Sequence, residues 1–100
     1  MTDKLFAALL EEKSAEYTDR LARKQKEYAT EDRLHNFKVA AAFQQCTVPQ
    51  ALFGFLTKHL VSLSDMIRSG ESYSDDIWDE KIGDSINYLF LLSLIFNPTF

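Results

Sequence analysis

Apolar residues recur every three or four positions through most of this chain, and this period restricts it to helices. Leu52, Leu56, Leu60 and Leu63, for example, fall on one side of a helix with ~3.6 residues per turn. No segment has the strict alternation of apolar and polar residues that is typical of a strand. The period therefore predicts an all-α fold.

Local start and stop signals divide the chain into four helices. Thr2 or Asp3 can cap a first helix that runs to about Lys26, and Thr30 or Asp32 can cap a second, alanine-rich helix. These signals, with two further helices, predict a four-helix bundle in a single domain that spans residues 1–100.

The third and fourth helices have the clearest boundaries. Thr47-Val-Pro49 is a strong start signal, and Gly70 is the expected stop. Ser74 or Asp75 can cap the last helix, which Asn97-Pro98 ends. The short connection between the two favours antiparallel packing.

Composition indicates that part of the surface is covered by another chain. A domain of 100 residues buries a smaller share of its surface than a larger domain does, yet many of its 8 phenylalanines lie in helices that are apolar on more than one side. We therefore expect a homo-oligomer.

Charge and targeting signals narrow the choice of partners. A net charge of -4 argues against binding to a nucleic-acid backbone, which needs clustered cations. The N-terminus lacks the organisation of a secretory signal, and the longest apolar run, 88–96, falls short of the ~20 residues that span a bilayer. Cys46 is the one cysteine, so no internal disulfide can form. These features predict a cytoplasmic protein without a membrane partner.

A line of polar residues precedes the apolar end of the fourth helix. Glu80, Asp84 and Asn87 are spaced i, i+4, i+7 and share one side, with Tyr88 beside them. Polar groups next to a buried seam indicate a ligand, a metal or a polar contact between subunits.

The third helix carries a matching line, formed by Lys58, Ser62 and Asp65, with His59 next to Lys58. Antiparallel packing would bring Asp65 towards the start of the fourth helix and Lys58 towards its apolar end. We therefore expect a polar pocket between these two helices.

Two other interpretations of these lines stay open. Lys58 can pair with Asp84 or Glu80 in a salt bridge that only fixes helix register. Alternatively, Asp65, Glu80 and Asp84 can supply oxygen ligands to Mg²⁺, although Lys58 nearby opposes a cation.

A second concentration of polar and aromatic residues joins the first two helices. Arg33, His35 and Asn36 offer hydrogen-bond donors for an anionic ligand, and Tyr28 offers a face on which a base could stack. The alternative is an ordinary connector with exposed charges.

Four elements in order resemble a known group of proteins. They are Lys24-x-x-x-Tyr28, His35-Asn36-Phe37, Lys58-His59-Leu60, and Glu80-Lys-Ile-Gly-Asp84-x-x-Asn87-Tyr88. Over roughly residues 20 to 96 the chain resembles small phage-encoded all-α proteins related to nucleotide-modification-associated domains and, more distantly, the MazG-like nucleotide pyrophosphohydrolases.

The resemblance implies a MazG-like helical bundle, a dimer or tetramer, and a nucleotide pocket. In those hydrolases, acidic elements on two helices hold magnesium. Here Thr57–Ser62 contains no carboxylate, and Lys81 stands where a glutamate is expected. Because metal charge is what stabilises the transferred phosphate, this loss favours binding over catalysis and predicts no cofactor.

The expected function is that of a non-catalytic, nucleotide-binding oligomer, which in a phage could sequester a nucleotide-derived host immune signal. The alternatives are a divergent magnesium-dependent pyrophosphohydrolase or nucleotide-modification enzyme, and an interaction protein without a small ligand. The residues expected to bind the ligand are Lys24, Tyr28, Arg33, His35, Asn36, Lys58, His59, Asp65, Asp84, Asn87 and Tyr88.

Overall fold

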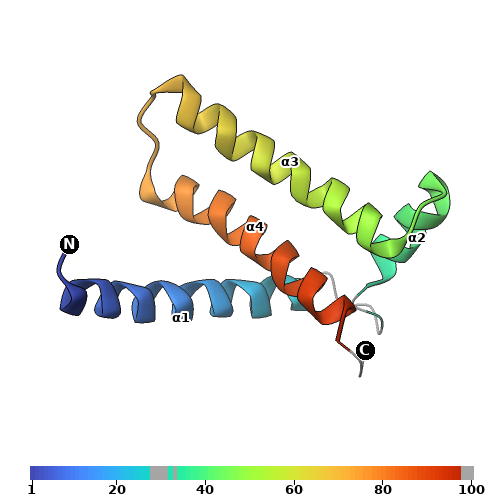
Figure 1. The fold of residues 1–100 in the computed structure, drawn as a ribbon, viewed down its shortest axis with the longest axis horizontal. Coiled ribbons are helices and arrows are strands. Elements are labelled where there is room, and N and C mark those ends of the chain that lie inside the picture. Colours follow the sequence, from blue (N-terminus) through green and yellow to red (C-terminus); the bar gives the residue numbers. More distant parts are fainter. Residues whose placement is uncertain (28–31, 33, 98–100) are drawn as a thin grey trace.

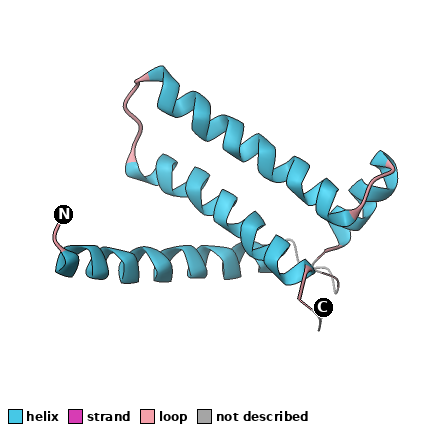
Figure 2. Ribbon diagram, in the orientation of Figure 1, coloured by secondary structure: helices cyan, strands magenta, loops and turns pink. Residues whose placement is uncertain are grey.

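The structure is a computed structural model that describes residues 1–27, 32 and 34–97. Four α-helices are present: α1 (Asp3–Glu27), α2 (His35–Gln44), α3 (Val48–Ser69) and α4 (Asp75–Ile95). The described residues form no strand (Figure 2). The all-α expectation is confirmed.

The boundaries of α3 and α4 lie where the capping signals put them. The Thr47 hydroxyl accepts a hydrogen bond from the Gln50 backbone amide, and the Gln50 side chain accepts one from the Thr47 amide, which completes a capping box. Gly70 ends α3 in the left-handed conformation, with φ of 67°. The Ser74 hydroxyl accepts from the Ile77 amide and starts α4.

The start of α2 is less regular. Leu34 precedes the helix, and its amide donates to the Asp32 carboxylate over 2.9 Å. Asp32, one of the two expected caps, therefore accepts a hydrogen bond just before the helix begins, but the cap position itself is occupied by Leu34. Thr30, the other candidate, lies outside the described residues.

Helices α3 and α4 form a central antiparallel hairpin (Figure 1). Helix α2 packs against α3, and α1 packs against α4. The buried core lies where α2, α3 and α4 meet, and its members are Leu34, Phe37, Leu52 and Leu91. Among its described residues, the long helix α1 contributes no buried side chain.

The fold is open for its size. Its radius of gyration is 15.7 Å, whereas a compact domain of this length has a value of about 13 Å. Of the large side chains in the described part, Leu52 alone is under 2% exposed. No helix within residues 1–27 or 34–97 is both long enough and apolar enough to cross a bilayer.

Gly83 marks the crossing of α1 over α4. A Cβ atom added at Gly83 would lie 3.0 Å from Arg20 Cδ and 3.4 Å from Tyr17 Cδ1, both on α1. The missing side chain of Gly83 therefore lets α1 cross α4 closely. Gly54, inside α3, has nothing within 4 Å of the same added atom.

Alanine substitutions at the two glycines should separate crowding from helix propensity. We expect Gly54→Ala to raise the free energy of unfolding by about 0.5–1 kcal/mol, because alanine favours a helix interior. The free energy of unfolding of Gly83→Ala should be about 1–3 kcal/mol lower than that of Gly54→Ala, because the added methyl group pushes Arg20 and Tyr17 outward. Urea unfolding measures both, and an equal gain in the two variants would contradict the close crossing.

Candidate functional site

Asp84 is the point at which three helices meet. Its residue is 9% exposed, and Lys24 Nζ on α1 forms an ion pair with Asp84 Oδ1. On the other side, His59 Nδ1 of α3 lies 3.8 Å from Asp84 Oδ2. One carboxylate on α4 thus joins α1 and α3, which lie on either side of that helix.

The two oxygens of Asp84 are not equally satisfied. A buried carboxylate needs a cation or donors, and Lys24 supplies both to Oδ1. The contact from His59 is longer than a hydrogen bond, so Oδ2 has no donor at bonding distance among the described residues. This oxygen therefore keeps capacity to accept from an amino or hydroxyl group.

Aromatic rings form a wall beside the carboxylate. The centres of the Tyr88 and His59 rings lie 5.1 Å apart, and their planes meet at 33°. The centres of the Tyr88 and Phe55 rings lie 6.3 Å apart, and these two rings are nearly parallel, with an angle of 12° between their planes. Phe37 of α2 meets Phe55 and Tyr88 edge-on. Because Phe55 and Tyr88 also pack on the buried core, the wall is fixed by the fold.

Asn87 adds an incomplete polar group next to Tyr88. Its side-chain oxygen is buried and finds no hydrogen-bond partner in the part of the chain that the structure describes. A buried acceptor without a donor costs roughly 1–3 kcal/mol. Such an atom needs an explanation, and a ligand or a water that donates to it is the simplest one.

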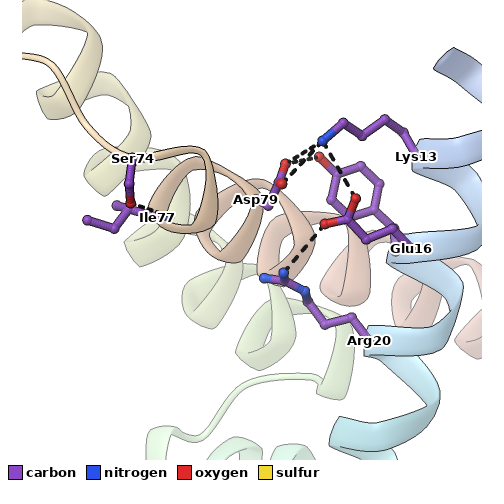
Figure 3. Close-up of polar contacts among 7 residues, drawn as sticks. Lys13, Glu16, Arg20, Ser74, Ile77 and Asp79 are labelled. Atoms are coloured by element: carbon purple, nitrogen blue, oxygen red, sulfur yellow. Dashed lines mark hydrogen bonds and ion pairs between the residues drawn. The ribbon is translucent and has the colours of Figure 1, made fainter.

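A polar contact fixes α1 against the start of α4 (Figure 3). Lys13 Nζ donates to both oxygens of Asp79, over 3.0 and 3.2 Å, and the Tyr17 hydroxyl donates to Asp79 over 3.2 Å. Glu16 pairs with Arg20 along α1 at 3.8 Å and with Lys13 at 3.6 Å. These contacts position α1 so that Lys24 reaches Asp84.

The same contact changes the acidity of its members. The hydrogen bond from Lys13 lowers the pKa of Asp79 below its ordinary 3.8, against the opposing effect of burial. Burial and then the charge of Asp79 raise the pKa of Tyr17. Both shifts favour an ionised Asp79 and a neutral Tyr17 in the folded protein.

The structure brings together some of the residues that the sequence singled out. Lys24, His59, Asp84 and Tyr88 gather in one place through direct contacts. Lys58 forms no ion pair with Asp84, because its Nζ lies over the Phe55 ring, 5.8 Å from the ring centre, and its residue is exposed. The ion pair considered for Lys58 and Asp84 is thus made by Lys24 instead.

The three carboxylates considered for magnesium do not gather. Asp65 and Glu80 are exposed, whereas Asp84 is buried beside Lys24. No three His, Cys, Asp or Glu side chains within residues 1–27, 32 and 34–97 are placed to hold one metal ion.

The second polar concentration is only partly described. His35 and Asn36 are exposed in the first turn of α2. Tyr28 and Arg33 lie outside the described residues, so their place relative to Asp84 stays a prediction.

Of the α1 face that builds the site, sequence reasoning singled out only Lys24. Lys13, Tyr17, Arg20 and Lys24 are spaced by four, three and four residues, which puts them on one side of the helix. Their spacing, read together with Gly83 on the partner helix, was the available signal for a polar helix interface.

Comparison of the chain with protein families, with curated proteins and with solved structures found no match. The site is therefore interpreted from its own geometry.

That geometry suits binding. Asp84 is engaged by Lys24 and so is poorly placed to accept a proton from a substrate. Cys46, the one thiol, is near the end of α2, where its neighbour is the Gln44 side chain at 3.8 Å. The cluster does offer a cation, an acceptor oxygen and a ring face within a few ångströms of one another.

The Asp79 contact should make stability depend on acid pH. Because the pKa of Asp79 is lower in the folded state, its contribution is fully present above 3.8 and is lost as the pH falls through the folded pKa. We expect Asp79→Asn to be less stable than the natural protein at pH 7, and the difference to shrink as the pH falls below 3.8 and to vanish once it passes the folded pKa.

Urea unfolding as a function of pH measures this difference. Asp19→Asn is the matched control, because it makes the same change of side chain at an exposed position of α1. A gap for Asp79→Asn that stays constant down to pH 2 would exclude an ionised Asp79 as its source.

Proposed function

We propose that this protein is a nucleotide-binding helical oligomer that holds its ligand without chemical change. The observation that carries the proposal is the convergence of Lys24 and His59 on Asp84 where α1, α3 and α4 meet, with the Tyr88 ring beside the His59 ring. Each group corresponds to one part of a nucleotide: a cation for phosphate, an acceptor for an amino or hydroxyl group, and a ring for the base.

The charge of the cluster narrows the ligand class. Lys24 is the cation in direct contact with Asp84, and the carboxylate offsets it. A triphosphate would place several negative charges beside a site of nearly balanced charge, which is unfavourable. Ligands with one charge per phosphate, such as cyclic nucleotides and ADP-ribose-type molecules, fit this balance better.

The buried Asn87 oxygen supports a ligand with donors. A base amino group or a ribose hydroxyl can donate to it and to the free oxygen of Asp84. Binding would then satisfy a polar atom that the described residues leave unpaired, which is how a site favours a ligand with a hydroxyl or amino group over one without it.

Two observations support binding rather than hydrolysis. The third helix carries Lys58 and His59 where the resembled hydrolases have acidic residues, and the carboxylates of Asp65, Glu80 and Asp84 lie apart. In a phage, a MazG-like protein of this kind would act by removing a nucleotide-derived immune signal of the host from solution. That role needs tight binding only.

Calorimetry with a panel of nucleoside monophosphates and triphosphates, cyclic dinucleotides and ADP-ribose tests the proposal. We expect heat from at least one low-charge member, and the ligand should be recovered intact after the complex is denatured. No heat from any member would refute nucleotide binding. Metal-dependent turnover that is lost in Asp84→Asn would instead establish the enzyme alternative.

Ring substitutions should locate the ligand. Tyr88→Leu removes the stacking face, and we expect it to weaken binding by about 1–3 kcal/mol. Tyr73→Leu is the matched control, because Tyr73 contacts Trp78 near the connection between α3 and α4, away from Asp84. Thermal unfolding of both variants checks that Tyr88→Leu leaves the fold intact.

Histidine substitutions repeat the test without touching the core. His59→Ala should weaken binding of the same ligand, whereas His35→Ala, at an exposed position of α2, should leave binding unchanged. If both histidine substitutions weakened binding equally, the ligand would have to contact the start of α2 as well.

A further inference from the structure

A second surface of α4 lies apart from the Asp84 cluster. Ile86, Leu89, Phe90 and Ser93 line a shallow groove of about 310 Å³. Their spacing of three, one and three residues places them on one face of the helix. Leu89 is 51% exposed and Phe90 is 48% exposed, so neither α1 nor α3 covers this face.

The groove lies in a segment without charge. Residues 86–96 contain no Asp, Glu, Lys or Arg. Covering this face would therefore remove apolar surface from water without the penalty of burying a charge. An uncharged face with two large exposed side chains is typical of the centre of a protein interface.

The start of α1 is a second uncovered apolar surface. Leu5, Phe6 and Leu10 are each at least half exposed. Figure 1 shows that this end of α1 extends beyond the hairpin of α3 and α4, and Lys13 is the first described residue of α1 with a polar contact to α4.

The accessible area indicates how much surface is uncovered. The chain exposes 7484 Å², whereas a compact monomer of 11.5 kDa exposes about 5,800 Å². The excess is about 1,700 Å². An obligate homodimer buries roughly 1,000–2,500 Å² per subunit, so the excess equals what one such interface would cover.

We propose that a second copy of this chain covers the α4 groove, with Leu89 and Phe90 at the centre of the interface. A ridge of side chains from a helix of the second copy fits a groove with this spacing. In a two-fold dimer the same patch serves both subunits, which suits a face that carries no charge to repel its own copy.

Other occupants fit this face less well. Residues 86–96 offer no Lys or Arg for anionic lipid head groups, and the net charge of -4 opposes such a surface. A small ligand would find Ser93 as the one polar group of the lining.

The inference rests on the oligomeric part of the proposed function and does not depend on the ligand. Sedimentation reports the dimer and calorimetry reports the nucleotide. A dimer that binds no nucleotide, or a monomer that binds one, would therefore show which of the two proposals had failed.

Sedimentation velocity of the full chain is the first test. We expect a mass of twice 11.5 kDa, and we expect Leu89→Glu and Phe90→Glu each to raise the dimer dissociation constant at least about 30-fold. Ile67→Glu is the matched control, because Ile67 is 69% exposed on α3 beside the charged Arg68. It should leave the dimer intact.

Cross-linking tests the same face without a new charge. In a Cys46→Ser background, Ser93→Cys places a thiol in the groove and should yield covalent dimers with a short bis-maleimide. Ser64→Cys, exposed on α3, should not. This measurement remains valid if a glutamate variant fails to fold.

Three results would overturn the proposal. They are a monomeric natural protein, dissociation by Ile67→Glu but not by Leu89→Glu, and equal cross-linking through Ser64→Cys and Ser93→Cys. Binding of the monomer to vesicles of neutral phospholipid, lost in Phe90→Glu, would assign the groove to a membrane instead.

Discussion

The placement of α1 against the hairpin of α3 and α4 depends on the ion pair of Lys24 and Asp84. Burying a carboxylate that is 9% exposed costs free energy unless it is paired, and the partner comes from a helix that contributes no described residue to the buried core. Removal of Lys24 alone would leave a buried charge, which is usually more harmful than removal of both members. The same ion pair therefore determines both where α1 packs and which charged groups line the site.

The regular parts of the fold could be predicted because their signals are local. The capping box of Thr47 and Gln50, the left-handed Gly70 and the Ser74 cap each involve residues within a few positions of one another. The four helices, their order and their antiparallel third and fourth members follow from such signals.

The site could be predicted only in part, because its ion pair joins residues 60 positions apart. The polar line on α4 was visible in the sequence, but its expected partner was Lys58 on the neighbouring helix, and the structure uses Lys24 on α1. Loop length indicates which helices are neighbours along the chain. It cannot indicate how a helix from the other end of the chain is placed, and that placement determines which cation reaches Asp84.

The attachment of α1 has a consequence for motion. Its described contacts with α4 are ion pairs and hydrogen bonds around Asp79 and Asp84, together with the stems of Tyr17 and Arg20 over Gly83. Contacts of this kind weaken in salt, whereas the core of α2, α3 and α4 does not depend on them. We therefore expect α1 to open as a separate cooperative unit, with backbone amides that exchange with solvent before those of the hairpin. Since it carries Lys24, its release would open the Asp84 cluster without unfolding the rest of the molecule.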